Sequence, residues 1–255
     1  MPDFTRRSFL AATPLLLAVC AQKPEPVLTA DGDSDDYLHA RPHTPPPPTV
    51  PSQKLERLGL ANDRDGYYYV PPSAKPNAPL MLYLHGATGN GQRGIQRWLT
   101  HADKAGVIVL APDSREQTWG VVFGDETDDL AFIDRALNKI FAHYSIDAKR
   151  IAATGFSDGA SAALSWGLMN GDLFSSVAAF SPGFLHLAGR PIGMPRIFLS
   201  HGLNDTILPI DKCGRRIAKI LMNAGYDVKF KIFEGDHEVP EIIRADALQW
   251  FVTSA

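Results

Sequence analysis

Apolar residues in this chain gather in short continuous runs, which polar and glycine-containing loops separate. The run Leu-Met-Leu-Tyr-Leu at residues 80–84 is an example. A run in which apolar and polar residues do not alternate predicts a strand buried on both faces, as in a parallel sheet. The predicted strands are 66–71, 80–84, 107–111, 151–154, 177–180, 197–200 and 228–233, with the first at the edge of the sheet.

Helical spacing of apolar residues appears between these strands. In the segment 129–144, Leu130, Ile133 and Leu137 fall on one face, and charged residues lie opposite. The predicted helices are 129–144, 160–169, 210–224 and 240–251, with Gly225 as a cap of the third. This alternation predicts a doubly wound α/β fold, in which helices cover both faces of a mostly parallel sheet. Ligands bind such folds beyond the carboxyl ends of the strands.

The first residues of the chain predict an export signal. Arg6 and Arg7 lie in a stretch that resembles the twin-arginine signature, and the apolar run 10–19 that follows is too short to span a bilayer comfortably. Two processing routes stay open: cleavage after Ala21, which we favour, and acylation of Cys20, which would add a lipid anchor. We expect a twin-arginine signal peptide at 1–21 and a periplasmic or extracellular protein.

Prolines and aspartates dominate the next segment, which includes four consecutive prolines at residues 45–48. Such a segment buries too little apolar surface to offset the entropy lost when it becomes ordered. We therefore expect a Pro-rich disordered linker at 22–53 and one folded domain at 54–255.

Composition narrows the possible partners. The 255 residues are 45% hydrophobic and 21% charged, as is ordinary for a globular protein with one sizeable core. A net charge of −3 without a basic run argues against nucleic acid, and no apolar stretch in the mature domain is long enough to span a membrane. Cys213 has no histidine or cysteine at metal-ligand spacing, which favours a buried structural role. We expect neither a metal nor a cofactor.

The motif Gly155-Phe156-Ser157-Asp158-Gly159 carries the clearest chemistry. It follows the predicted strand 151–154 and precedes the alanine-rich helix 160–169. A Gly-x-Ser-x-Gly turn between a strand and a helix is typical of the nucleophile elbow of serine hydrolases. Ser157 is therefore the predicted nucleophile.

A serine hydroxyl is a weak nucleophile and needs a base, which in turn needs a carboxylate. His237 is the last histidine in the chain and lies in the loop after strand 228–233. Asp205 lies in the loop after strand 197–200, and Asp211 and Asp236 are its rivals. The order Ser157, Asp205, His237 is that of α/β-hydrolases. We predict that these three residues are catalytic.

An oxyanion hole needs two backbone donors. The amide of Asp158 should supply one. The amide of Ala87 should supply the other, because His85-Gly86-Ala87 follows the strand 80–84. We expect His85 itself, and His201 before Gly202, to form structural hydrogen bonds.

Two aromatic residues are candidates for the substrate pocket. Trp119 lies beyond the strand that ends at Ala111, and Phe184 lies in the loop after strand 177–180. Either could bind substrate or simply pack in a loop. No long insertion separates the strands, so we expect no large lid domain and an open, shallow pocket.

These motifs resemble the α/β-hydrolase superfamily from about Tyr67 to the end of the chain. The nearest branch is that of compact esterases grouped with polyhydroxybutyrate depolymerases, feruloyl esterases and small carboxylesterases or phospholipases. The resemblance implies the triad and an ester-cleaving activity. Many members of that branch carry Asn where this chain has Asp158, a change that makes the site more acidic. The motifs are His85-Gly86, Asp128 to Ile133, Gly155 to Gly159, His201-Gly202-x-x-Asp205 and Gly235-Asp236-His237.

The sequence thus predicts an exported serine esterase that cleaves a small-molecule or polymeric ester through an acyl-enzyme. Two alternatives stay open. A peptidase of the same fold would share the triad, although this chain lacks the large accessory domain common in such peptidases. A non-catalytic protein that binds the cell envelope is the other.

Overall fold

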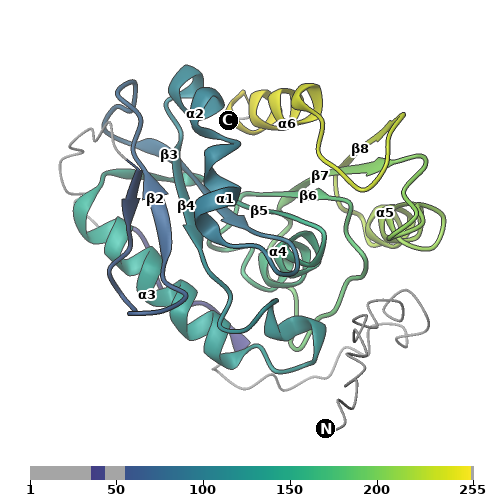
Figure 1. Ribbon diagram of the computed structural model, residues 1–255, viewed down its shortest axis with the longest axis horizontal. Coiled ribbons are helices and arrows are strands. Elements are labelled where there is room, and N and C mark those ends of the chain that lie inside the picture. Colours follow the sequence, from purple (N-terminus) through teal and green to yellow (C-terminus); the bar gives the residue numbers. More distant parts are fainter. Residues whose placement is uncertain (1–35, 44–54, 254–255) are drawn as a thin grey trace, which may run out of the picture.

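The computed structural model describes residues 36–43 and 55–253 (Figure 1). Its centre is a single eight-stranded sheet, in which the order of the strands across the sheet differs from their order along the chain. The strands, in order across the sheet, are β1 (Leu55–Arg57), β2 (Gly66–Tyr69), β4 (Ile108–Pro112), β3 (Ala78–Leu84), β5 (Ile146–Phe156), β6 (Ser176–Phe180), β7 (Arg196–Gly202) and β8 (Val228–Phe233).

All seven predicted strands are present, and the six from β3 to β8 run parallel. The prediction that 66–71 is an edge strand is wrong. β2 pairs antiparallel with β4 on one side and with the short strand β1 on the other. β1 escapes sequence analysis because it has only three residues and none of them is fully buried.

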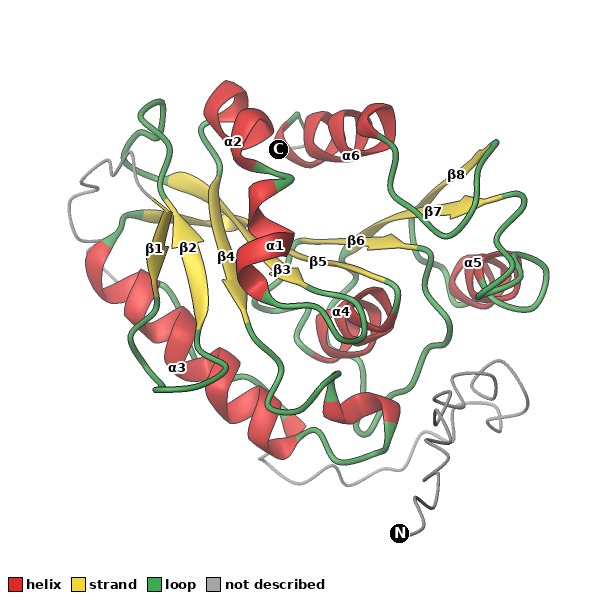
Figure 2. Ribbon diagram, in the orientation of Figure 1, coloured by secondary structure: helices red, strands yellow, loops and turns green. Residues whose placement is uncertain are grey.

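Helices cover both faces of the sheet, as predicted (Figure 2). One face carries α1 (Gly91–Gln96), α2 (Leu99–Ala105) and α6 (Glu241–Val252), and the other carries α3 (Thr127–His143), α4 (Asp158–Met169) and α5 (Gly214–Asn223). The 3₁₀ turn η2 (Gly120–Val122) precedes α3. α1 and α2 are too short to show helical periodicity in the sequence. In the described residues no large lid domain covers the sheet.

The helix predicted at 210–224 begins later, at Gly214. The backbone amides of Lys212 and Cys213 both donate to Pro209 O, so the preceding residues form a turn. Cys213 is fully buried at this junction. Gly225 ends the helix with a φ of 87°, the left-handed conformation of a glycine cap.

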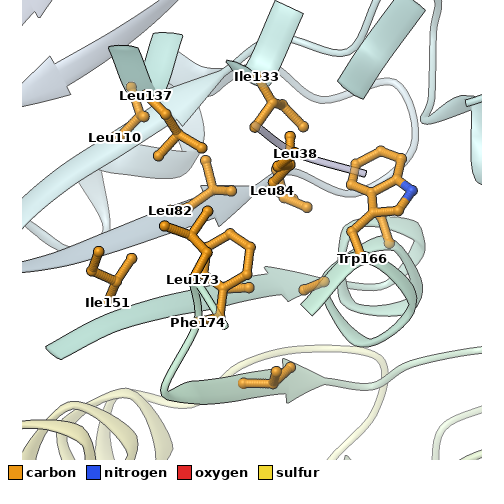
Figure 3. Close-up of a cluster of buried hydrophobic side chains, with 14 of the residues drawn as sticks. Leu38, Leu82, Leu84, Leu110, Ile133, Leu137, Ile151, Trp166, Leu173 and Phe174 are labelled. Atoms are coloured by element: carbon orange, nitrogen blue, oxygen red, sulfur yellow. The ribbon is translucent and has the colours of Figure 1, made fainter. Parts of the chain in front are cut away.

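The larger hydrophobic core lies between the sheet and helices α3, α4 and α5 (Figure 3). Leu82 and Leu84 of β3 meet Ile133 and Leu137 of α3 there, with Trp166 of α4 beside them. A second core lies under α1, α2 and α6. These two apolar layers fix the helices on the faces of the sheet and leave its carboxyl edge free to carry polar side chains.

Residues 36–43 correct the linker prediction for part of its length. Leu38 and Ala40 are each 2% exposed, and Leu38 belongs to the larger core. The amide of Leu38 donates to Asn170 Oδ1 at 2.8 Å, and those of His39 and Ala40 donate to Asp134 Oδ1 at 2.8 and 2.7 Å. Side-chain acceptors on the domain, the buried Asn170 and the partly buried Asp134, therefore replace the water that a free linker would bind.

The predicted signal peptide, including Cys20, and the rest of the predicted linker lie outside the described residues. Within the described part of the chain, no helix is long and apolar enough to cross a membrane.

Candidate active site

Ser157 stands between the end of β5 and the start of α4. Its φ of 57° and ψ of −121° are a conformation that residues with a side chain rarely adopt. The turn leaves no room for side chains on either side. A Cβ on Gly155 would lie 2.1 Å from Gly159 O, and one on Gly159 would lie 2.2 Å from Leu84 O. The structure therefore has the strained strand-turn-helix geometry that the motif predicts.

Three polar side chains from separate loops meet at the carboxyl edge of the sheet. His237 Nε2 lies 2.9 Å from Ser157 Oγ, and His237 Nδ1 lies 2.7 Å from Asp205 Oδ2. Asp205 follows β7 and His237 follows β8, and these strands are neighbours in the sheet. The Asp205 side chain is fully buried, whereas 15% of the His237 side chain stays exposed. A reactant can therefore reach the imidazole but not the carboxylate behind it.

Backbone hydrogen bonds fix the orientation of the Asp205 carboxylate. Its Oδ1 accepts from the amides of Ile207 and Leu208 at 3.0 and 2.8 Å, which leaves Oδ2 for His237. The rival Asp211 is instead exposed and pairs with Arg215. Of the three candidate carboxylates, Asp205 is the one that contacts His237.

This arrangement selects one tautomer of His237. Because Asp205 Oδ2 is an acceptor, the proton of the neutral imidazole belongs on Nδ1. The unprotonated Nε2 then accepts from the Ser157 hydroxyl, which is the arrangement that a general base requires.

His201 packs behind the carboxylate. Its Nε2 donates to Leu208 O at 2.6 Å and lies 3.3 Å from Asp205 Oδ2. Burial lowers the pKa of His201, against the opposing effects of the Leu208 hydrogen bond and Asp205. His201 therefore has the structural hydrogen bond expected of it and supports the loop that carries Asp205.

The loop after β3 passes beside the nucleophile. A Cβ on Gly86 would lie 3.2 Å from Ser157 Cβ, a tight contact, so the glycine lets the backbone pass close to the nucleophile without crowding it. Ala87 follows in the same loop, and Asp158 is the first residue of α4. Asp158 is therefore adjacent to Ser157 in the chain, and Ala87 follows the glycine that lies against Ser157. The role of both amides as oxyanion donors stays a prediction. The Asp158 carboxylate accepts from the Thr118 hydroxyl at 2.7 Å.

Solved structures show the fold independently. The crystal structure of esterase PE8 aligns with a TM-score of 0.61 at 20% identity and covers 79% of this chain and 100% of its own. Thermogutta terrifontis esterase 2, phosphorylated by paraoxon, aligns with a TM-score of 0.60 at 17% identity, over 82% of this chain and 95% of its own. A family model described as phospholipase/carboxylesterase matches residues 129–250. The chain has the α/β-hydrolase fold.

Two curated proteins resemble this chain in sequence. A bifunctional acetylxylan esterase/xylanase of Neocallimastix patriciarum is 32% identical over 155 residues, which are 57% of this chain and 22% of that protein. A probable feruloyl esterase C of Aspergillus niger is 29% identical over 161 residues, which are 59% of this chain and 58% of that protein. The chain thus spans less than two thirds of the length of either relative.

The structure does not place the two predicted pocket aromatics where substrate could touch them. Trp119 is 0% exposed, and its indole N–H donates to His85 O at 2.7 Å while the ring packs against Trp166. Phe184 is 8% exposed and belongs to the larger core. Both predictions are wrong for the same reason. Loops at the carboxyl edge of the sheet also bury aromatic side chains in the hydrophobic core, which fixes the loops in place. Trp119 instead holds the loop that precedes Ala87.

Several positioning residues could not be assigned a role from the sequence. Asp129 is 3% exposed, and its carboxylate accepts from the amides of Arg115 and Gly120 at 2.7 and 2.6 Å. It thereby shapes the loop that carries Trp119. Its place in the Asp128 to Ile133 motif was the available signal. Ser161 and Ser165 of α4 similarly accept from the loop after β6.

The buried, neutral state of His85 in the loop after β3 can be tested through the pH dependence of protein stability. Its Nδ1 donates to Gly86 O at 2.8 Å, and its Nε2 accepts from the amide of Ser114 at 3.0 Å. Burial lowers the pKa of His85 from 6.5 to about 4. The unfolded chain therefore binds more protons between these two pKa values, so His85 makes stability fall as pH drops from about 6.5 towards about 4.

We expect the free energy of unfolding of the wild type to fall by about 2.5 kcal/mol more than that of His85→Gln between pH 7.5 and pH 4.5. Urea unfolding at both pH values measures this difference. His143→Gln is the matched control, because His143 is exposed at the end of α3. Equal losses in the wild type and His85→Gln would contradict the predicted protonation state.

In the described residues, no group of three or more histidine, cysteine, aspartate or glutamate side chains is arranged to hold a metal ion.

Proposed function

We propose that this protein is a serine esterase of the α/β-hydrolase superfamily and cleaves carboxylic esters through an acyl-enzyme. The chain of contacts from Ser157 Oγ through His237 to Asp205 carries the proposal. The esterases among its relatives and structural neighbours support an ester as the substrate over a peptide.

The proposed reaction has two halves. Ser157 Oγ attacks the ester carbonyl carbon while His237 Nε2 takes the hydroxyl proton, and the amides of Asp158 and Ala87 bind the oxyanion. The intermediate then collapses, the ester C–O bond breaks, and the leaving alcohol takes the proton from His237. Water next attacks the acyl-enzyme and gives its proton to His237. The carboxylic acid leaves as that proton returns to Ser157.

A fluorophosphonate probe tests the proposal directly, because it reacts with an activated serine. We expect labelling of the wild-type protein at Ser157, located by mass spectrometry, together with turnover of p-nitrophenyl acetate. Absence of labelling would favour the non-catalytic envelope-binding alternative. Faster turnover of a p-nitroanilide amide than of the matched ester would favour a peptidase.

We also propose that the protein is exported by the twin-arginine route. Arg6, Arg7 and the apolar run that follows support this proposal. Replacing both arginines by lysine should keep the protein in the cytoplasm when the full chain is expressed in a bacterium with this route, and cell fractionation measures the result. Unchanged export of the lysine variant would rule the route out. Mass spectrometry of the exported protein distinguishes cleavage after Ala21 from acylation of Cys20.

A further inference from the structure

A small cavity opens directly beside the candidate catalytic residues. Its volume is about 190 Å³, and its walls come from α1, the loop after β3 and the beginning of α6. Phe156 lines it and packs against His237, with ring centroids 4.8 Å apart. Gly86, which lies against Ser157, and its neighbour Ala87 line it too. A substrate with its carbonyl at Ser157 can therefore place a substituent in this cavity.

Three arginines give the cavity its charge. Arg93, Arg97 and Arg244 line it, and none of the other described residues in its wall is acidic. Arg93 and Arg97 are four residues apart on α1 and its cap, so they share one side of the helix. Neither forms an ion pair or a side-chain hydrogen bond with any described residue. Two guanidinium groups in the cavity wall are therefore available to an anion.

Arg244 occupies the opposite wall. Its guanidinium donates to Val239 O and pairs with Glu241 at 2.7 Å, while its Nε is buried without a partner among the described residues. Glu241 itself is 70% exposed and does not line the cavity. Arg244 thus adds positive charge to the wall of the cavity, even though one side of its guanidinium group already pairs with Glu241.

Glycines place these arginines where they are. A Cβ on Gly94 would lie 2.4 Å from Tyr83 Cε1, and one on Gly91 would lie 2.0 Å from Ala111 O. Only an α1 without these side chains can lie against β3 and β4 and point Arg93 and Arg97 toward the cavity. Burial raises the pKa of Tyr83 to about 12, and Arg97 and Arg244 oppose this rise, which places both cations near the same phenol.

We propose that the cavity binds a carboxylate carried by the substrate, so that acid-bearing esters are preferred over neutral ones. This inference rests on the proposed esterase function and names its substrate class. The planar guanidinium forks of Arg93 and Arg97 match a carboxylate in geometry and charge. The carboxylate of Asp158 does not oppose this, because it bonds Thr118 and lies outside the cavity wall.

Two matched pairs of esters test the inference on either arm of the substrate. p-Nitrophenyl hydrogen adipate and p-nitrophenyl hexanoate differ by a carboxylate on the acyl arm. 4-Carboxyphenyl butanoate and 4-carbamoylphenyl butanoate differ by a carboxylate on the alcohol arm. The quantity measured is the ratio of kcat/KM for the acidic ester to that for the neutral ester, after subtraction of spontaneous hydrolysis.

We expect the wild-type ratio to exceed one on at least one arm and to fall by about 10-fold in the double variant Arg93→Gln/Arg97→Gln. Arg97→Lys, which keeps the charge but loses the planar fork, should give a ratio between those of the wild type and the double variant, and 0.5 M NaCl should reduce the wild-type ratio. Arg216→Gln is the matched control, because Arg216 is exposed on α5 on the other face of the sheet. It should leave the ratio unchanged.

The outcomes separate the two proposals. If the wild type hydrolyses the esters but the double variant changes the acidic-to-neutral ratio of neither pair, the carboxylate site is overturned and the esterase proposal stays intact. A ratio that falls equally in Arg216→Gln also overturns the site, because the effect would then be nonspecific. Failure of the wild type to hydrolyse any of the four esters overturns the esterase proposal and this inference with it.

Discussion

Replacing Ser157 by alanine is expected to lower the esterase kcat by about 10⁶-fold and to abolish fluorophosphonate labelling. The variant keeps the elbow backbone but has no oxygen to attack the carbonyl. His237→Ala should lose nearly as much, because Ser157 Oγ then has no group at 2.9 Å to take its proton. The double variant should be scarcely worse than either single one, since the residues act as a unit. Steady-state kinetics with p-nitrophenyl acetate measures all three.

Surface residues of the same types serve as controls. Ser73 and His143 are exposed and precede the starts of β3 and β5, at the opposite ends of these strands from the elbow, so Ser73→Ala and His143→Ala should keep wild-type kinetics. Circular dichroism and thermal unfolding check that the active-site variants remain folded. A folded Ser157→Ala protein that still turns over the ester at the wild-type rate would rule out Ser157 as the nucleophile.

Replacing Asp205 by asparagine should lower kcat by about 10⁴-fold with little change of structure. An asparagine can keep its oxygen toward the amides of Ile207 and Leu208, which bind Oδ1 in the native protein. Its NH₂ group then replaces Oδ2 and faces His237 Nδ1. A donor there favours the tautomer that carries its proton on Nε2, and that nitrogen can no longer accept from Ser157.

The exposed Asp211 provides the control for this substitution, because it pairs with Arg215 and does not contact His237. Asp211→Asn should keep the wild-type kcat. If Asp205→Asn behaves like Asp211→Asn, Asp205 does not orient the base. A loss of kcat that is accompanied by unfolding at the assay temperature would instead show that the carboxylate is needed mainly for the loop.

Much of the fold followed from the sequence because its signals are local. Seven apolar runs predicted seven strands, and four periodic segments predicted helices that the structure contains. α1, α2 and β1 were missed because each is too short to repeat a pattern. The segment 36–43 was misjudged for the opposite reason. Its composition predicts a linker, but Asn170 and Asp134 on the domain bind its backbone amides.

The sequence by itself determined the glycines that allow the strained turn at Ser157, and the order of Ser157, Asp205 and His237 along the chain. Tertiary structure alone decided which carboxylate meets His237, because a contact between residues 32 positions apart depends on how β7 and β8 pair. It also decided that Trp119 is an internal anchor, while Arg93, Arg97 and Arg244 converge on one cavity. Burial and convergence depend on how distant segments pack together, and no local pattern of residues records them.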